Sequence, residues 1–492
     1  MRRLRFGLGL LCLSLLTLGV RAQTTRPAIR AAQPPSYTVA EVAGPKNVEL
    51  EVGGMDWMPD GRLAVCIRRG DVWTFAKGNW KLFASGLQEP LGVMRGTGDN
   101  DLYVMQRPEL THLVDTHGTG AADLYQTVNM NFGFSGNYHE FAYGPAVDRE
   151  GYVYFSLNLA HNPDAFGAAF MGAHVETPYR GWVFKSVTPG AKDGKFEPFA
   201  YGVRSPNGLA ANPAGDIFFT DNQGEWIAAC WLGQIKEDRF YGNPSSMIFT
   251  KDWNHRDPKT VTVEELDRKR TPPAVLFPYG RMGQSLSQPI WDTTGGKFGP
   301  YEGQCFVGDV QIPLVMRATL EKVDGEYQGA CYPFVRDPIL QGANRLLFDP
   351  SNGSLLVGRT DRGWIQGAYG ITRITYSGVL PFDILKMSLT PRGFDLQFTK
   401  PVDAKKAADP QTYSLLHWHM IYHKDYGSPE VDKTAVKIQQ AIVSGDGRHV
   451  ALILPELLVG KIYDLTLEGL NAADGSELIN NHAYYTLNHL IK

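Results

Sequence analysis

Several polar residues stand beside short strand-like segments, where their side chains can do chemistry. His139 lies in the run Gly136–Pro145, just before a predicted strand, and an imidazole in that place can act as a general base. Arg204 and Asn207 lie in the run Tyr201–Gly208. An arginine can hold a carboxylate by two parallel hydrogen bonds, and an asparagine can donate and accept beside it. The alternative for each residue is a structural role in a turn or at a sheet edge.

A segment rich in oxygen ligands follows the next predicted strand. Asp221 and Gln223 offer side-chain oxygens, and Gly224 offers its backbone carbonyl. Hard cations such as Ca²⁺ prefer oxygen ligands. The segment therefore predicts a calcium site formed by these three residues, with an ordinary acidic turn as the alternative.

Cationic residues recur in the second half of the chain. They are Arg317, Arg345, Arg359 and Arg362, and Trp364 follows closely. Guanidinium groups that converge would bind an anionic ligand, and an indole would offer it a flat stacking face. The alternative is that each arginine forms an ordinary ion pair.

Three histidines near residue 420 form a weaker pattern. His417 and His419 alternate, so on a strand they share one face and could chelate a metal ion, and His423 follows. Aromatic packing on a half-exposed strand is the alternative that we favour here.

The N-terminus has the pattern of a secretory signal peptide. Arg2, Arg3 and Arg5 precede an apolar run over residues 6–20, and a small-x-small motif ends at Ala22. We expect residues 1–22 to be removed, which predicts a secreted or periplasmic protein without a membrane span. Residues 23–36 are rich in proline and read as a flexible leader.

Four cysteines lie beyond the signal peptide: Cys66, Cys230, Cys305 and Cys331. An oxidising compartment permits disulfides. The first pair that we would expect is Cys305 with Cys331, because they lie 26 residues apart on neighbouring apolar runs. Free buried thiols that pack as small hydrophobic groups are the alternative.

A weak internal repeat organises residues 37–378. Each unit is a turn with glycine or asparagine followed by an alternating apolar strand, and the six turns lie near residues 61, 100, 151, 215, 303 and 353. Six such units predict a six-bladed β-propeller, a fold that closes radially. Thr262–Lys269 is the only stretch that we predict to be helical, and it lies in the longest insertion.

A boundary is predicted near residues 378–381. Beyond it, residues 379–492 contain short alternating segments separated by turns, which is typical of an immunoglobulin- or fibronectin-like β-sandwich. The fold class is therefore all-β, with a propeller followed by a sandwich.

Composition and missing motifs narrow the function. The chain of 492 residues has 48 basic and 51 acidic side chains, so no basic excess suggests nucleic-acid binding. The motifs GxGxxG, GxxxxGK[ST], HExxH and GxSxG are missing from the sequence, which argues against nucleotide cofactors, zincin proteolysis and α/β-hydrolase chemistry.

These segments resemble a known family. The runs around His139 and Arg204 and the strand that ends at Asp221 look like the glucose/sorbosone dehydrogenase superfamily, six-bladed propellers whose founding members use pyrroloquinoline quinone and Ca²⁺. Further runs resemble the secreted sorbosone-dehydrogenase-like proteins of planctomycete-type bacteria. They are Asp221–Trp226, Phe240–Pro244, Phe306–Asp309, Glu326–Gly329, Arg362–Trp364 and Ala483–Asn488.

The resemblance implies a role for each candidate residue. His139 would take the proton of the substrate hydroxyl while hydride passes to the quinone, which Arg204 and Asn207 would contact. Arg345 would clamp a quinone carboxylate. Oxygens around Gln223 and Gly224 would hold Ca²⁺, which acts on the quinone carbonyl as a Lewis acid.

Three functions remain open from the sequence. The first is a secreted oxidoreductase that oxidises a sugar or polyol with pyrroloquinoline quinone and Ca²⁺. Because no CxxCH haem motif occurs, its electrons would pass to a separate carrier such as a cytochrome c. The second is a non-catalytic propeller that binds carbohydrate or protein. The third is a metal-dependent lactonase, in which Glu140, Asn207 and Asp221 would converge on one metal ion.

Overall fold

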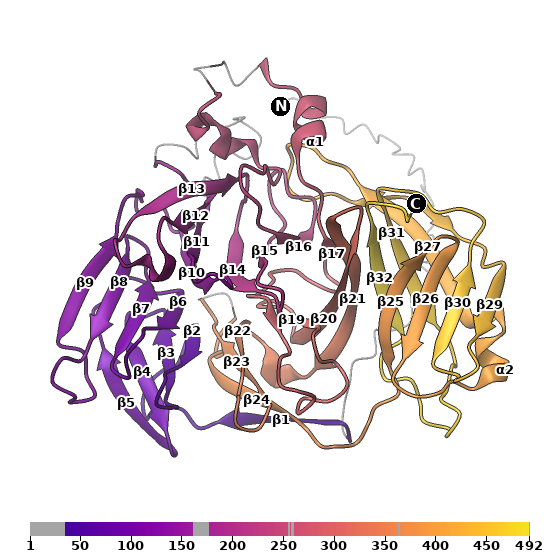
Figure 1. The fold of residues 1–492 in the computed structure, drawn as a ribbon, viewed down its shortest axis with the longest axis horizontal. Helices are drawn as coiled ribbons and strands as arrows, with labels where there is room; N and C mark the ends of the chain where they lie inside the picture. Colours follow the sequence, from indigo (N-terminus) through magenta and orange to yellow (C-terminus); the bar gives the residue numbers. More distant parts are fainter. Residues whose placement is uncertain (1–34, 161–176, 254–255, 257–259, 363–364, 492) are drawn as a thin grey trace, which may run out of the picture.

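The computed structural model describes residues 35–160, 177–253, 256, 260–362 and 365–491. Strands dominate these residues. Five four-stranded antiparallel sheets and one half of an eight-stranded sheet form six blades, and a two-sheet unit follows them. The inner strands β2, β6, β10, β14 and β18 contact one another in turn, and β22 contacts β2 on one side and β19 on the other, which completes a ring. Figure 1 shows this ring face on, with the two-sheet unit beside it. The ring is a six-bladed β-propeller.

The first three blades are consecutive four-stranded meanders, each read from its inner to its outer strand. Their strands are β2 (Val52–Trp57), β3 (Leu63–Ile67), β4 (Val72–Ala76), β5 (Asn79–Ala84), β6 (Gly92–Arg95), β7 (Asp101–Met105), β8 (Leu110–Val114), β9 (Leu124–Asn129), β10 (Ala142–Val147), β11 (Val153–Leu157), β12 (Trp182–Ser186) and β13 (Phe196–Tyr201).

The last three blades follow the same order, except that the sixth takes its outer strand from the start of the described chain. Their strands are β14 (Pro206–Ala211), β15 (Ile217–Asp221), β16 (Cys230–Gln234), β17 (Val275–Phe277), β18 (Ile290–Trp291), β19 (Cys305–Gly308), β20 (Leu314–Val323), β21 (Glu326–Arg336), β22 (Ala343–Phe348), β23 (Leu355–Arg359), β24 (Gly370–Tyr376) and β1 (Tyr37–Val42). The pairing of β1 with β24 closes the ring, because it joins the first strand to the last blade.

All six predicted turns lie between the first and second strands of their blades. The turns near 61, 100, 151, 215, 303 and 353 connect β2 to β3, β6 to β7, β10 to β11, β14 to β15, β18 to β19 and β22 to β23. The glycine turn is required there because the two strands reverse direction within a few residues; Gly151 and Gly215, for example, have φ of 88° and 91°.

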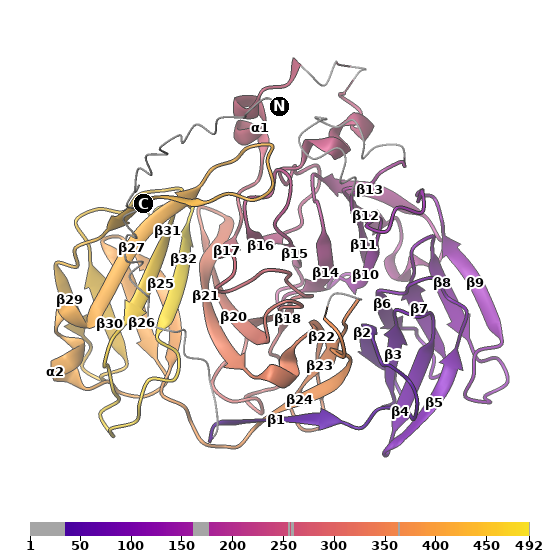
Figure 2. The same cartoon turned by 180° about the vertical axis from the view of Figure 1, so that it is seen from behind.

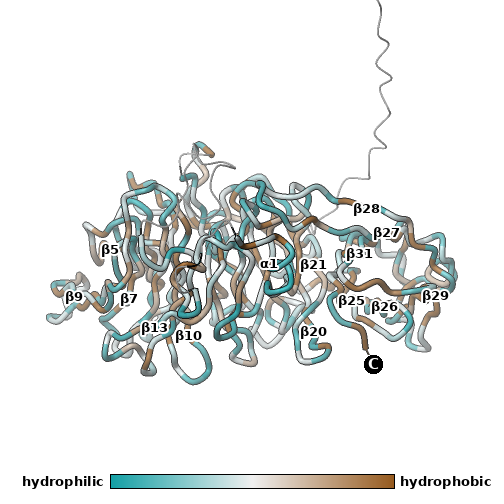
Figure 3. Tube along the Cα trace, turned by 90° about the horizontal axis from the view of Figure 1, so that it is seen from above, coloured by the Kyte–Doolittle hydropathy of each residue, from teal (hydrophilic) through white to brown (hydrophobic). Residues whose placement is uncertain are grey.

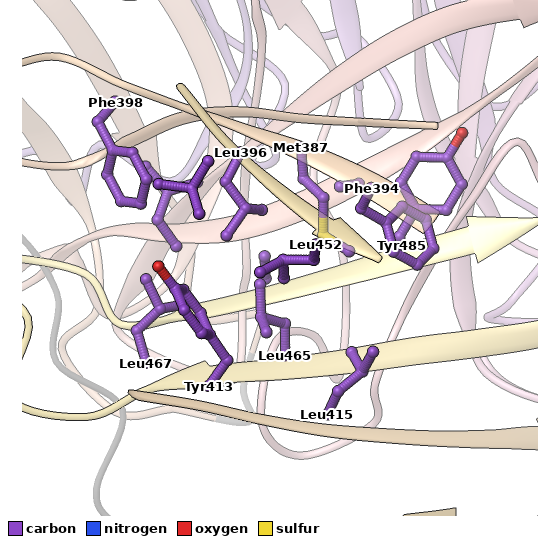
Figure 4. Packing of buried hydrophobic residues seen from close by; sticks show 14 of the residues in the cluster. Met387, Phe394, Leu396, Phe398, Tyr413, Leu415, Leu452, Leu465, Leu467 and Tyr485 are labelled. Atoms are coloured by element: carbon purple, nitrogen blue, oxygen red, sulfur yellow. The ribbon is translucent and has the colours of Figure 1, made fainter. Parts of the chain in front are cut away.

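Residues beyond 381 form two four-stranded sheets. One has the order β25 (Ile384–Thr390), β26 (Gly393–Phe398), β30 (His449–Ile453) and β29 (Gln440–Val443). The other contains β32 (His482–Leu487), β31 (Lys461–Leu467), β27 (Tyr413–Met420) and β28 (Glu430–Ala435). Figure 4 shows the apolar core between them, which includes Met387, Leu396 and Leu465. The assignment of this two-sheet unit, the sandwich, to the immunoglobulin-like class stays a prediction.

The sandwich is joined to the propeller by a continuous sheet. β32 pairs with β21, the outer strand of the fifth blade, so that one eight-stranded sheet runs from β18 to β28. Figure 2 shows the sandwich beside this blade. A hydrogen-bonded sheet fixes the relative position of its strands. The sandwich is therefore held against the fifth blade along a strand, and not only by the connection at residues 377–383.

Helices are few and short in the described residues. The α-helices are α1 (Val263–Lys269) and α2 (Ala404–Ala407), and 3-10 helices span Pro189–Ala191, Pro244–Phe249, Pro338–Leu340 and Pro410–Thr412. The predicted helix is confirmed: Thr262 caps α1 by accepting a hydrogen bond from the backbone of Glu265. α2 was not predicted, because four residues are too few for a periodic signal. No helix in the described part of the chain is long and apolar enough to cross a membrane.

The expected disulfide is wrong, since all four cysteines are free and buried. Cys305 lies on β19 and Cys331 on β21, and both are paired with Ala318 of the strand between them. The two cysteines are therefore two strand spacings apart, about 10 Å, whereas a disulfide needs Cα atoms within about 7 Å.

Candidate functional site at one face of the propeller

Nearly all predicted site residues belong to one face of the ring. Strands of a blade alternate in direction, so the connection that enters an inner strand and the connection from second to third strand emerge on the same side. His139 and Arg204 lie in connections that enter β10 and β14, while Gln223 and Gly224 lie between β15 and β16. Figure 3 shows the disc edge on, with the loops of its two faces separated.

The propeller axis is occupied by a buried guanidinium. Arg345 on β22 is only 2% exposed. Its Nη1 donates to the backbone and side-chain oxygens of Asn207 on β14, at 3.0 and 3.1 Å, and its Nη2 donates to the carbonyl of Leu91 at 2.9 Å. The structure thus brings together Arg345 and Asn207, which lie 138 residues apart.

The hydrogen-bond partners of Arg345 are all neutral oxygens. Besides those of Asn207 and Leu91, they are the backbone and side-chain oxygens of Asn344, at 2.7 and 3.1 Å. Burial lowers the pKa of Arg345 to about 10, so the group still carries its charge at neutral pH. The ring of Tyr143 lies 5.3 Å from the guanidinium carbon. The axis therefore holds a cation whose hydrogen bonds include no carboxylate.

Glycines let the inner strands converge beside this cation. A small cavity of about 30 Å³ is lined by Arg345 together with Gly92, Gly144 and Gly208. A Cβ atom on Gly92 would lie only 1.5 Å from the carbonyl oxygen of Gly144, so glycine is required where β6 approaches β10. A cavity of this size holds about one water molecule.

His139 is oriented as a base. Its Nδ1 lies 2.7 Å from the carbonyl oxygen of Leu159, and because a carbonyl can only accept, Nδ1 carries the proton. In the neutral ring the lone pair is therefore on Nε2. The side chain of Asn137 also accepts from the His139 backbone N–H at 3.0 Å, which fixes the start of the turn. This tautomer is the one that a proton acceptor at Nε2 needs.

Aromatic rings connect His139 to Arg345. Phe141 and Tyr143 follow His139 at strand spacing, with ring centroids 5.8 Å apart for His139 and Phe141 and 6.1 Å for Phe141 and Tyr143. The guanidinium carbon of Arg362 lies 3.9 Å from the centroid of Phe141. We call this group, completed by Arg107, the channel-mouth cluster.

Arg107 is the member of the cluster that sequence reasoning missed. It follows β7 in the second blade, and its guanidinium carbon lies 5.3 Å from the centroid of Phe141. It also donates to Glu89 at 3.1 Å. Two arginines near one phenyl ring give this face cationic and flat aromatic surface together. The alternation His139-x-Phe141-x-Tyr143 was the available signal for the aromatic path, while nothing in the sequence places Arg107 beside it.

Arg204 lies on the same face but is already engaged. Its Nε donates to Glu225 at 3.2 Å, and its guanidinium carbon lies 5.3 Å from the ring of Tyr426, which belongs to the sandwich. A Cβ atom on Gly224 would clash with the guanidinium at 1.9 Å. Arg204 thus packs against Gly224, and its charge is matched by a carboxylate.

The three predicted calcium ligands do not form a cation site. Both oxygens of Asp221 accept backbone N–H groups, from Arg204 at 2.8 Å and Ser205 at 2.7 Å. Gly224 already accepts from two backbone N–H groups, those of Ile227 at 3.1 Å and Gly427 at 3.0 Å. Burial raises the pKa of Asp221 to about 6, which disfavours the charged form that Ca²⁺ requires.

Gln223 does not complete the site either. Its amide nitrogen donates to the carbonyl of Ala228 at 3.1 Å. No group of three or more His, Cys, Asp or Glu side chains in the described residues is arranged to hold a metal ion. The three residues expected for a lactonase metal site, Glu140, Asn207 and Asp221, have other partners. Glu140 accepts a hydrogen bond from Thr177 at 2.8 Å, whereas Asn207 accepts one from Arg345. Asp221, Gln223 and Gly224 therefore do not provide the Ca²⁺ site that the sequence predicted.

A loop of the sandwich covers this part of the face. Gly427 and Ser428 donate backbone hydrogen bonds to Gly224 and Ala228, and the hydroxyl of Tyr422 donates to Gly242. Figure 2 shows the loop that leaves β27 toward the blade of β16 and β17. The oxygen atoms expected to face a cation are in this way turned to the sandwich, some 200 residues further along the chain.

Arg317 lies elsewhere, so its predicted role at the cofactor is wrong. It is fully buried on β20, where its Nη2 donates to Asp383 at 2.8 Å and its Nη1 to Gln304 at 3.0 Å. The rings of Tyr301 and Tyr332 lie 4.5 and 4.3 Å from its guanidinium carbon. Arg317 is part of the joint between the fifth blade and the sandwich. Trp364 lies outside the described residues.

Two other predicted features also have structural partners. His419 Nδ1 lies 2.8 Å from the ammonium of Lys461, and a cation in that place opposes metal binding by the histidines of β27. Arg359 donates to Glu41 on β1 at 2.7 Å, which ties it to the closing strand of the sixth blade.

Comparisons with known proteins find similarity in fold. No family model matches the chain, and no curated protein matches it. Among solved structures, the chain is similar to the holo form of the PQQ domain of pyranose dehydrogenase from Coprinopsis cinerea, with 11% identity and a TM-score of 0.50 over 70% of this chain and 98% of that one. It is also similar to a Trichoderma reesei protein of Carbohydrate-Active Enzymes Family AA12, with 14% identity and a TM-score of 0.50 over 73% and 100%.

A soluble aldose sugar dehydrogenase from Escherichia coli matches with 13% identity and a TM-score of 0.48, over 69% of this chain and all of that one. At such identities the likeness concerns the fold alone. The share of this chain that is covered is close to the share occupied by its six blades. The relationship to planctomycete-type proteins stays a prediction.

Proposed function

We propose that the protein is an oxidoreductase that oxidises a hydroxyl group of a sugar or polyol at the channel-mouth cluster. The observation that carries the proposal is the path from His139 to Arg345: a base-competent imidazole, two aromatic rings and a buried cation with only neutral hydrogen-bond partners. The sugar dehydrogenases that share the fold support the substrate class.

His139 acts as the general base. Its Nε2 accepts the proton of the substrate hydroxyl, while the carbonyl of Leu159 holds the Nδ1 proton and stabilises the imidazolium that forms. The hydride on the same carbon then leaves toward an electron acceptor. A positioned base contributes about 10²–10⁴-fold to such a reaction.

The cluster fits a planar anionic acceptor better than it fits a calcium complex. Arg345 and Arg362 supply cations, Arg107 adds a guanidinium whose charge is shared with Glu89, and Phe141 and Tyr143 supply flat apolar faces. Pyrroloquinoline quinone, when bound, supplies a two-electron acceptor for the hydride, and its carboxylates match these arginines in charge. Because the predicted calcium ligands are engaged with backbone groups, we propose that these arginines balance its charge without Ca²⁺ at Gln223 and Gly224.

We further propose that the protein works outside the cytoplasm and passes its electrons to a separate carrier such as a cytochrome c. The support is the signal-peptide pattern of residues 1–22 and the lack of a CxxCH motif. N-terminal sequencing of the exported protein tests the first claim, since it would begin at Gln23.

A dye-reduction screen over aldoses and polyols, with added quinone, tests the proposed function. We expect turnover that falls at least a hundredfold in His139→Ala, with His117→Ala, an exposed histidine of the second blade, as the matched control. A wild-type protein that binds a sugar but reduces no dye would instead support the second candidate, a non-catalytic carbohydrate-binding propeller. That candidate is favoured by the hydrogen bonds that already engage the predicted calcium ligands Asp221, Gln223 and Gly224.

A further inference from the structure

A cavity of about 140 Å³ lies in the seam between the fourth blade and the sandwich. The propeller contributes Trp226 and Leu276 to its wall, and the sandwich contributes Met420, Tyr422 and Ile462. Protein interiors are densely packed and contain few voids larger than a water molecule. A void of this size, with mostly apolar walls, is comparable with cavities that bind benzene.

Part of the lining of the cavity is polar. Arg270 and Thr271, which follow α1, line it together with Asn488. The hydroxyl oxygen of Thr271 is buried and has no hydrogen-bond partner in the structure, whereas the amide of Asn488 donates to Pro273 at 2.8 Å. A buried hydroxyl without a hydrogen-bond partner is unfavourable. A bound ligand would supply the partner that the Thr271 hydroxyl lacks.

The cationic and aromatic groups of the lining lie close to one another. The guanidinium carbon of Arg270 lies 4.8 Å from the centroid of Tyr422, whose ring is 5.3 Å from that of Trp226. Arg270 donates through Nε to Asp267, a half-exposed carboxylate. Its remaining N–H groups, on Nη1 and Nη2, form the fork that suits a carboxylate.

We propose that this seam binds a small planar aromatic carboxylate of the benzoate class. The ring fills the apolar part beside Trp226 and Tyr422, and the carboxylate accepts hydrogen bonds from Arg270 and the Thr271 hydroxyl. A sugar fits less well, because each of its hydroxyl groups would need a partner and the wall offers mainly apolar side chains. The ligand touches both the propeller and the sandwich, so its binding stabilises their junction.

The inference is independent of the proposed function, since none of these residues belongs to the channel-mouth cluster. Calorimetric titration of the full chain with sodium benzoate and with uncharged benzyl alcohol tests it. We expect 1:1 binding of benzoate and a rise in Tm. Thr271→Val should weaken benzoate about tenfold, the loss expected for one hydrogen bond to a charged group. Arg270→Met should weaken benzoate more than benzyl alcohol.

Two further variants place the ligand. Ala228→Phe fills the cavity and should abolish binding of both compounds, while Thr434→Val, the same type of change as Thr271→Val but on the exposed strand β28, should leave binding unchanged. Absence of benzoate binding in the wild type would overturn the proposal. So would benzoate affinity that Ala228→Phe and Thr271→Val leave intact, or binding of glucose in this cavity in place of benzoate.

Discussion

Two fully buried arginines show how differently the same side chain is used in this molecule. Arg317 lies at the joint with the sandwich and faces the carboxylate of Asp383, which is itself fully buried. Arg345 lies on the propeller axis, and its hydrogen bonds go only to neutral oxygens. Burial lowers the pKa of both groups, but at Arg317 Asp383 together with Tyr301 and Tyr332 outweighs burial, and the net shift of the pKa is upward.

The difference indicates what each site can do. A buried ion pair balances the charge of both partners, so it holds two parts of a protein in one arrangement and offers little to an anionic ligand. A buried cation without a carboxylate partner would be stabilised by an anion that binds near it. The joint is therefore structural, and the axis is the place where an anionic ligand gains most.

The largest expected effect on stability comes from removing the carboxylate partner of Arg317, so that this arginine, like Arg345, has no buried carboxylate beside it. Asp383→Asn leaves the guanidinium of Arg317 buried without a carboxylate, which should lower the free energy of unfolding by about 3–5 kcal/mol. Urea unfolding followed by circular dichroism measures it. Asp395→Asn, at a partly exposed position of β26, is the matched control. A loss below about 1 kcal/mol in Asp383→Asn would show that the pair does not hold the joint.

Asp221 extends the comparison to a buried group of opposite charge. Burial raises its pKa in the folded protein to about 6 from the usual 3.8, so the folded state binds the proton more tightly than the unfolded state does. This contribution is fully present below about pH 4 and is lost as pH rises through 6, an effect of about 3 kcal/mol.

Urea unfolding at pH 4 and at pH 7.5, in the wild type and in Asp221→Asn, checks this pH dependence. The wild type should lose more stability than the variant between the two values. Parallel profiles for the two proteins would mean that the backbone N–H groups around Asp221 compensate fully for its burial.

Removal of the axial cation should have a smaller effect on stability than Asp383→Asn. Arg345→Met takes away a charge with no carboxylate partner but leaves buried carbonyls without donors, for which we expect a loss of about 1–3 kcal/mol. Affinity for the anionic quinone should fall at least tenfold, as expected for loss of a charge-assisted contact. Equilibrium unfolding and calorimetry measure the two effects separately. A stability loss larger than that of Asp383→Asn would reverse the order proposed here.

The smallest effect concerns Arg204, which is intermediate between the two arginines because Glu225 pairs with it at a partly exposed position. Tyr426→Ala removes the sandwich ring from the guanidinium and should cost about 0.5–1 kcal/mol, the range for a partly exposed cation–π contact. Tyr426→Phe keeps the ring and should match the wild type in urea unfolding. A phenylalanine variant as unstable as the alanine variant would assign the effect to the hydroxyl group instead.

The repeats in the sequence predicted the fold well because each blade begins with the same local structure. The turns at Gly61, Gly151 and Gly215 combine a positive φ with an alternating strand, and both are visible in a short window of sequence. Pairing of β21 with β32 was not predictable in this way, because the two strands are more than 140 residues apart and neither carries a local signal for the other.

The site was predicted only in part for the same reason. His139, Asn207 and Arg345 lie in or beside inner strands, which all converge on the axis, so their blade position already placed them together. Arg317 lies on the third strand of its blade, away from the axis. The position of its strand within the blade would have had to be known to predict that distance. Gly224 fits an oxygen site in sequence, but Gly427 from the sandwich occupies its carbonyl.

The central claim is that the channel-mouth cluster, with the buried charge of Arg345 behind it, is a site for a planar anionic acceptor. Calorimetric titration with pyrroloquinoline quinone, with calcium removed by a chelator, tests it most directly in the wild type, Arg345→Met and Arg204→Ala. We predict binding that persists without calcium, is lost in Arg345→Met and is only weakened in Arg204→Ala. No binding in the wild type, binding that requires Ca²⁺, or equal affinity in Arg345→Met would contradict it.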